Sequence, residues 1–499
     1  MNEHKMQLYP TTQATTAIII LSCIFRTSKA SFQSRSIGLH NCCTLPRVWN
    51  QVGPEFLGQT KSKTRLLSLQ RAIMEQKNLE QNDTGCPIHT HYIFLIHGWL
   101  GNSKEMGFLE SSINTEVASI AKASSTIPSG TEATATRIVT HSAKCNDEKT
   151  TDGIAIGGSR LAQEIQQFII EDMQSNTGRD ALCELPPPEH NCSISFVGNS
   201  LGGLYARFAL SLIPDKLQLQ SDDSVEESSM PSVNLHRQIF ATTATPHLGV
   251  ASHTFLPIPR TLEHFISRTL KATGRDLFRT DDIDLIYEMS TDYETFLRPL
   301  SLFRKRIAYV NAFRTDFQVP TSTAAFLSKN SAYPHFIDEA IDVPFLVAIA
   351  RTDEKHDILI QKIYKEQMSR KQTQVMMSTK LDALGWQKVF IDVRGYIPIP
   401  GIALPSFLKR SSRQKWDDFI KSQQVSGGDE NKKQVESRDL ERMMSGSDRL
   451  DIPVGHQVMV ANSKSKSYSK FTEKGRPVMN YLAGWMVKEL KEAIPVMTD

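Results

Sequence analysis

The feature that most constrains the fold of this chain is a single serine between two glycines, in the run Gly-Asn-Ser-Leu-Gly at residues 198–202. Residues 194–197 before it are apolar and suit a short buried strand, and apolar residues recur at helical spacing over 201–213. Flanking glycines allow the tight strand-to-helix turn on which an exposed nucleophile sits. Ser200 is therefore the candidate nucleophile; the alternative is a glycine-rich turn in an unrelated α/β protein.

Composition indicates an ordinary globular protein with enough apolar material for a large core. The 499 residues are 40% hydrophobic and 22% charged, so one large domain with appendages is expected. The net charge of +3 is small for this length and gives no electrostatic reason to expect a nucleic-acid partner. The seven cysteines have no metal-binding spacing, so no metal is expected, and a disulfide between Cys183 and Cys192 remains open.

The N-terminal segment differs in character from the rest. Residues 17–25 are mostly apolar, too few to span a bilayer but the right number for the core of a signal peptide. Residues 4–54 contain no acidic side chain, which is typical of organelle transit peptides. Residues 1–60 are therefore predicted to be a disordered targeting presequence that leads to a plastid or the endomembrane system. The alternative is a cytoplasmic protein with a disordered N-terminal tail.

Apolar runs and helical periodicities alternate along the remainder of the chain, which predicts an α/β fold with a mostly parallel central sheet flanked by helices over 88–495. Residues 251–303 break this alternation with helical patterns, as a cap over the site or an ordinary packing helix pair would. Residues 214–232 and 411–449 are polar and are predicted to be surface insertions. Strands are expected at 91–96, 135–141, 194–197, 238–243, 306–311, 344–350 and 387–393, with helices at 158–172, 201–213 and 476–492.

A serine hydroxyl becomes a good nucleophile only with a base in hydrogen-bond reach and a third group that orients that base. For a serine on a turn of this kind, the chain order is serine, acid, histidine. His335, His356 and His456 follow Ser200 with a strand and an acid between. His456 is the preferred base because it stands after a polar loop and before the last expected helix, and His356 is its rival.

The candidate acid is Asp316, which follows the expected strand 306–311. A carboxylate just beyond the end of a parallel strand can reach the edge of the sheet to which the serine turn points. Asp353, after the expected strand 344–350, occupies a comparable place and is the main alternative.

The negatively charged oxygen of a tetrahedral intermediate needs preorganised donors. The backbone N–H of Leu201, directly after the nucleophile, is one natural donor. Trp99, in His-Gly-Trp after the strand 91–96, is predicted to supply the second from its backbone. His97 precedes the nucleophile and is expected to brace this loop rather than to act as the base.

Several motifs together resemble a known family, the DUF676 serine esterases or lipase-like α/β-hydrolases of eukaryotes, over about residues 90–495. The matching segments are 91–101 (ending His-Gly-Trp-Leu-Gly), 152–161, 196–207, 244–249 (Ala-Thr-Pro-His-Leu-Gly), 307–323, 381–389 and Gly455-His456. The resemblance implies an α/β-hydrolase fold with a helical cap. It also implies a triad of Ser200, Asp316 and His456 with an oxyanion hole near Trp99, in agreement with the choice from position and order.

These observations predict a serine hydrolase that cleaves carboxylic esters, acyl lipids above all, through an acyl-enzyme intermediate. No cofactor is expected. The partners expected are a lipid or other hydrophobic ester substrate and a peripheral membrane contact. Two alternatives stay open: a catalytically silent α/β-hydrolase that binds lipid or a protein partner, and an acyltransferase that uses the same triad.

Overall fold

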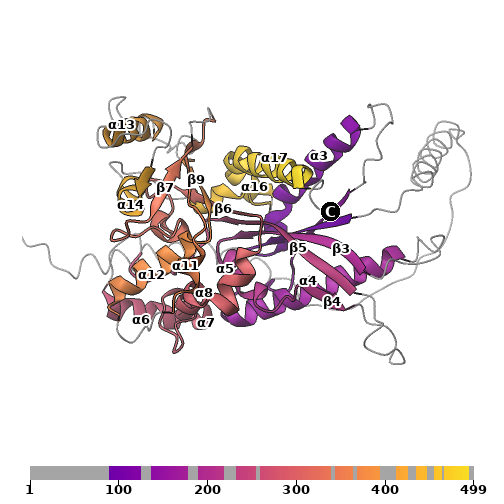
Figure 1. Cartoon of the computed structure of the whole chain (residues 1–499), viewed down its shortest axis with the longest axis horizontal. Coiled ribbons are helices and arrows are strands. Elements are labelled where there is room, and N and C mark those ends of the chain that lie inside the picture. The colour runs from indigo at the N-terminus through magenta and orange to yellow at the C-terminus, as the bar shows by residue number, and fades with distance from the viewer. Residues whose placement is uncertain are drawn as a thin grey trace, which may run out of the picture. The chain divides into compact units, whose positions relative to one another are not determined.

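A ten-stranded sheet forms the centre of the molecule (Figure 1), in the order β10-β7-β8-β9-β6-β5-β3-β1-β2, with β4 paired to β5. Strands β2, β1, β3, β5, β6 and β9 are neighbours in this order and are all parallel. Strands β8, β7 and β10 continue the sheet beyond β9 in antiparallel fashion, and β4 pairs antiparallel with β5. The strands are β1 His89–Ile96, β2 Thr136–Ser142, β3 Glu189–Asn199, β4 Lys216–Gln218, β5 Ser232–Thr243, β6 Lys305–Asn311, β7 Pro334–Ile337, β8 Leu346–Arg351, β9 Gln387–Ile391 and β10 Gln434–Glu436.

The structure is a computed structural model, and all the residues it describes fall in the unit Ile88–Asp499, one of two into which the chain divides. The predicted targeting segment 1–60 lies outside the described residues, as does Cys183. The described ranges are 89–124, 136–177, 189–218, 232–253, 259–338, 343–362, 368–393, 412–424, 434–446, 455–463 and 466–493.

Helices cover both faces of the sheet because its central strands are apolar on both sides. On β1, Tyr92 and Phe94 face one core and Ile93 and Leu95 face the other, as the two-residue period of a strand requires. Helices α4 and α5 pack on the first face, and α3 and α17 pack on the second. The flanking helices are α3 Gly107–Ser124, α4 Ile154–Thr177, α5 Leu201–Leu210 and α17 Arg476–Ala493.

The remaining helices lie between or beyond these elements. They are α6 Arg260–Thr269, α7 Lys271–Leu277, α8 Leu285–Thr291, α9 Arg298–Ser301, α10 Thr321–Ala324, α11 His356–Ile360, α12 Arg370–Asp382, α13 Ser412–Gln424, α14 Ser437–Ser445, α15 Gly455–Met459 and α16 Lys466–Thr472. Short 3-10 helices at Ser103–Met106 and Glu473–Gly475 and a π-helix at Tyr293–Leu297 complete the set. The predicted α/β architecture, a mostly parallel sheet flanked by helices, is confirmed.

The two predicted polar insertions contain more regular structure than their composition suggested. Within 214–232 the chain forms β4, and β5 begins at Ser232. Within 411–449 it forms α13, β10 and α14, and the side chains of Leu440 and Met444 are fully buried. In α14, two apolar residues that lie four apart on one face pack into the core, although the charged residues between them dominate the composition.

The helical segment within 251–303 is fastened to the helices that flank Ser200. Arg207 of α5 is buried, and its guanidinium donates to the backbone oxygens of His247 at 3.1 Å and Met289 at 2.6 Å. Earlier in the segment, Asp276 of α7 accepts from the backbone N–H of Ile154 at 2.6 Å. These contacts join α7 and α8 to α4 and α5 as one packed layer.

Glu164 of α4 holds the loop that follows β2. Its carboxylate accepts from the ring of His141 at 2.9 Å and from the backbone N–H groups of Lys144 and Cys145 at 2.9 and 2.8 Å. Burial alone would raise the pKa of Glu164, but these donors lower it to about 2. The same loop carries Asp147, which braces the chain next to Ser200.

We expect Glu164→Gln to lower the free energy of unfolding by about 1–2 kcal/mol at neutral pH. Because the pKa is lowered by folding, this contribution is complete above the ordinary pKa of 4.5 and is lost as the pH falls from there towards about 2. Urea unfolding of wild type and variant should therefore converge over that interval. Glu171→Gln, at an exposed position of the same helix, is the control, and a difference that persists unchanged at the lowest pH would contradict this account.

Candidate active site

Ser200 occupies a strained turn between β3 and α5. Its backbone has φ 54° and ψ −123°, a conformation that residues with a side chain rarely adopt. The backbone N–H of Ser200 donates to Thr243 of β5 at 2.8 Å, which holds the turn against the neighbouring strand. A Cβ on Gly202 would meet the backbone oxygen of His97 at 2.6 Å, so glycine is required where α5 approaches the end of β1. This is the turn that the sequence predicts.

The loop after β1 lies directly against the serine. A Cβ added to Gly98 would stand 2.8 Å from Cβ and 3.3 Å from Oγ of Ser200. Trp99 therefore follows a residue that touches the candidate nucleophile. Leu201 is the first residue of α5, where backbone N–H groups have no acceptor within the helix. The two predicted oxyanion donors thus belong to the two segments that adjoin Ser200 Oγ.

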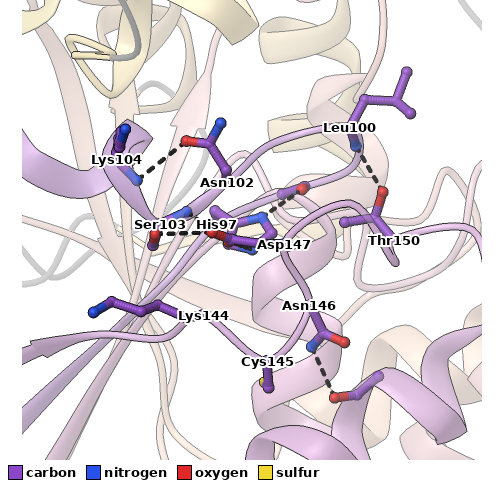
Figure 2. A network of polar contacts seen from close by, with 12 residues as sticks. His97, Leu100, Asn102, Ser103, Lys104, Lys144, Cys145, Asn146, Asp147 and Thr150 are labelled. Atoms are coloured by element: carbon purple, nitrogen blue, oxygen red, sulfur yellow. Dashed lines mark hydrogen bonds and ion pairs between the residues drawn. The ribbon is translucent and has the colours of Figure 1, made fainter.

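A polar network fixes this loop to the one that follows β2 (Figure 2). The ring of His97 lies 3.0 Å from the Gly98 oxygen through Nδ1 and 3.1 Å from Asp147 through Nε2. Asp147 also accepts from the backbone N–H and the hydroxyl of Ser103, at 2.8 and 3.0 Å. Burial would raise the pKa of Asp147, but its contacts with His97 and Ser103 lower it below its ordinary value. His97 thus has the bracing position expected of it.

His456 and Asp316, 140 positions apart in the sequence, are in direct contact. Nδ1 of His456 lies 2.9 Å from Oδ2 of Asp316, with the two residues 8% and 1% exposed. The other carboxylate oxygen of Asp316 accepts from the backbone N–H groups of Gln318 and Val319 at 2.9 and 2.8 Å. Because a carboxylate only accepts, Nδ1 must donate, and the neutral ring then has its lone pair on Nε2. A histidine in this state can act as a general base.

Asn311 is a further member of the site that sequence reasoning missed. Its side-chain N–H donates to Oδ2 of Asp316 at 2.9 Å, the same oxygen that His456 contacts. A carboxylate accepts only, so this contact fixes the orientation of the amide. A Cβ added to Gly455 would lie 2.9 Å from the amide oxygen of Asn311, so glycine lets α15 approach. The sequence offered one signal for this role: an asparagine ends the apolar strand five residues before Asp316.

The alternative candidates for the base, His335 and His356, and for the acid, Asp353, lie elsewhere in the structure. His335 is fully buried in β7, where its Nε2 lies 2.8 Å from Nζ of Lys388. Asp353 and His356 are exposed. The described contacts of these three residues do not include Ser200, Asp316 or His456. His335 has its own acidic neighbour, Asp382, at 3.5 Å, in a pair that also contacts Lys388.

The sheet brings Ser200 and Asp316 to the same edge. Strand register places Asn199 beside Thr243 and Thr243 beside Tyr309, so the end of β3 and the end of β6 are level. Two strand spacings of about 4.8 Å put these ends roughly 10 Å apart. Ser200 and Asp316, each of which follows one of these strands, therefore lie at the same edge of the sheet. A serine, a histidine and an acid are the side chains that nucleophilic acyl transfer requires.

The described residues contain no group of three or more His, Cys, Asp or Glu side chains able to hold a metal ion. Among the described helices, none combines the length and the apolar character needed to cross a bilayer. Within the same ranges, Cys145 and Cys192 have free thiols, and burial raises the pKa of both.

Comparison with known proteins gives a curated relative and several solved structures. The putative lipase ROG1 of Saccharomyces cerevisiae is 28% identical over 283 residues, which are 55% of this chain but only 34% of the yeast protein. This chain therefore matches about a third of that relative's length. Among solved structures, phospholipase PlaB from Legionella pneumophila in complex with thio-NAD aligns with a TM-score of 0.25 and 14% identity over 44% of this chain and 38% of that one. A Listeria innocua gene product aligns at 0.22 and 13%, over 47% of this chain and 74% of that one.

The sequence profile of the family described as putative serine esterase (DUF676) matches residues 88–329. That span contains Gly98, Ser200 and Asp316, whereas His456 lies beyond it. Both the profile and the yeast relative support a lipase- or esterase-like hydrolase. Through residues 88–329, this chain is similar to the DUF676 family of putative serine esterases.

Proposed function

We propose that this protein hydrolyses carboxylic esters of acyl lipids through an acyl-enzyme on Ser200. The observation that carries the proposal is the buried contact between His456 and Asp316 at the sheet edge where the strained Ser200 turn ends. A Ser–His–Asp set needs this pair to fix the imidazole tautomer and to stabilise the imidazolium that forms.

The proposed reaction has two halves. Ser200 Oγ attacks the ester carbonyl while Nε2 of His456 takes its proton, and the resulting oxyanion is held by the backbone N–H groups of Leu201 and Trp99. The intermediate then expels the alcohol, which receives the proton from His456. In the second half, His456 removes a proton from water, the hydroxide attacks the acyl carbon, and the fatty acid leaves as Ser200 regains its proton.

The lipid part of the proposal has separate support. The yeast relative is called a putative lipase, and the loop that adjoins Ser200 bears Leu100, which is 42% exposed. Ile156, in the first turn of α4, is 51% exposed. Exposed aliphatic side chains beside a catalytic turn suit an apolar acyl chain better than a polar ester.

We expect Ser200→Ala to abolish labelling by a fluorophosphonate probe and to abolish hydrolysis of a soluble short-chain ester. The probe reacts only with a serine whose proton a neighbouring base can remove. Ser195→Ala, in strand β3 before the turn, removes a buried hydroxyl without touching the site and is the matched control. Full labelling of the Ser200→Ala protein would refute the nucleophile assignment.

Asn311→Leu should lower kcat for the same ester about tenfold and leave KM close to that of wild type, because one hydrogen bond to a charged acceptor is lost. As a positioning residue, Asn311 should slow the rate of probe labelling by a similar factor. Asn311→Asp should be worse, since it sets a second carboxylate beside Asp316. A folded Asn311→Leu protein with unchanged kcat and labelling rate would remove Asn311 from the account.

Gly98→Ala should reduce kcat about tenfold or more, because the new Cβ would stand 2.8 Å from Cβ of Ser200 and push the two segments apart. Gly107→Ala is the control, as its Cβ would meet Ser463 at an ordinary 3.7 Å. Steady-state kinetics together with thermal unfolding separate a shifted site from a lost fold. Wild-type kcat in Gly98→Ala would show that this loop does not adjoin the reacting atoms.

A further inference from the structure

The outer face of α6 and α7 has an unusual combination of side chains. On α6, the residues that are exposed lie at helical spacing and include His264, Phe265 and Arg268. Phe265 is 66% exposed, more than any other large apolar side chain among the described residues. On α7, Lys271 and Arg275 are exposed four positions apart. One aromatic ring and three cations are therefore exposed on two successive helices, α6 and α7; we call these side chains the outer face of the two helices.

The carboxylates of the same two helices point inward. Glu263 is 2% exposed and accepts from the backbone N–H of Ser252 and from the guanidinium of Arg260. Asp276 is buried and accepts from the backbone N–H of Ile154. The outer face thus keeps a net positive charge even when exposed Asp282, in the turn after α7, is included.

This face is connected to the loop that adjoins Ser200. The hydroxyl of Thr273 on α7 donates to the Thr150 oxygen at 2.7 Å, and Thr150 Oγ1 accepts from the backbone N–H of Leu100 at 2.9 Å. The first turn of α4, which carries exposed Ile156, is bonded to α7 as well, because Gly153 donates to Thr273 at 3.0 Å. The cationic face and the two exposed aliphatic side chains therefore belong to one bonded group of segments.

We propose that the outer face of α6 and α7 binds the surface of a bilayer rich in anionic phospholipid. Basic side chains near such a surface are attracted by its negative potential, and an aromatic ring at the same level enters the interface. The physiological purpose rests on the proposed lipid hydrolysis, since the contact would present ester lipids to Ser200, but the binding itself requires no catalysis.

The test uses the full chain carrying Ser200→Ala, so that lipid is not consumed, and measures cosedimentation with phosphatidylcholine vesicles with and without phosphatidylserine. We expect tighter binding when phosphatidylserine is present. Replacing Arg268, Lys271 and Arg275 with Glu should weaken that binding by about tenfold or more. The control replaces Lys470, Lys474 and Lys491 with Glu, which makes the same charge change at exposed positions of α16, the 3-10 helix at Glu473–Gly475 and α17.

The outcomes separate this inference from the proposed function. Equal binding to both kinds of vesicle, or equal losses in the two triple variants, would overturn it. With Ser200 intact, the α6–α7 variant should hydrolyse a soluble short-chain ester at the wild-type rate and an ester lipid in phosphatidylserine vesicles about tenfold more slowly. If the protein hydrolyses esters but binds both kinds of vesicle equally, only the membrane inference is wrong. If it binds phosphatidylserine vesicles preferentially but hydrolyses no ester, only the enzyme assignment is wrong.

Discussion

The strained turn at Ser200 is the constraint on which the rest of the site depends. A residue with a side chain at φ 54° is held there only because its surroundings leave no alternative. The N–H of Ser200 is bonded to β5, and Gly98 and Gly202 let the end of β1 press on it from the other side. The parallel sheet therefore has to form before the serine can be presented. The geometry of the candidate site therefore depends on the same contacts that hold the sheet together.

Much of the architecture could be predicted because the central strands are buried on both faces. Continuous apolar runs such as Tyr92 to Ile96 are characteristic of such strands, and the helices between them carry a clear period. Short edge elements lacked such a signal. Strand β10 has three residues and β7 four, and α14 is charged on most of its surface. Their place depends on tertiary contacts that no local pattern encodes.

The candidate site shows the same division between what the sequence indicates and what depends on tertiary contacts. Ser200, Asp316 and His456 follow from motif and chain order, since those express the topology of parallel strands. Asn311 did not follow, because its role depends on the direction in which one amide points after β6 and α15 have come together. Arg207 was missed for a related reason. It is a buried cation held by the carbonyl groups of His247 and Met289, and burial lowers its pKa to about 9.

The central claim is that Ser200, activated by His456 and Asp316, carries the acyl group during turnover. Rapid mixing of the wild-type protein with an activated acyl ester, acid quenching and peptide mass mapping tests it most directly. The account predicts an adduct with the mass of the acyl group on the peptide that contains Ser200, which forms and decays at rates compatible with turnover. Steady ester hydrolysis with no acyl adduct, or with an adduct on another residue, would contradict it.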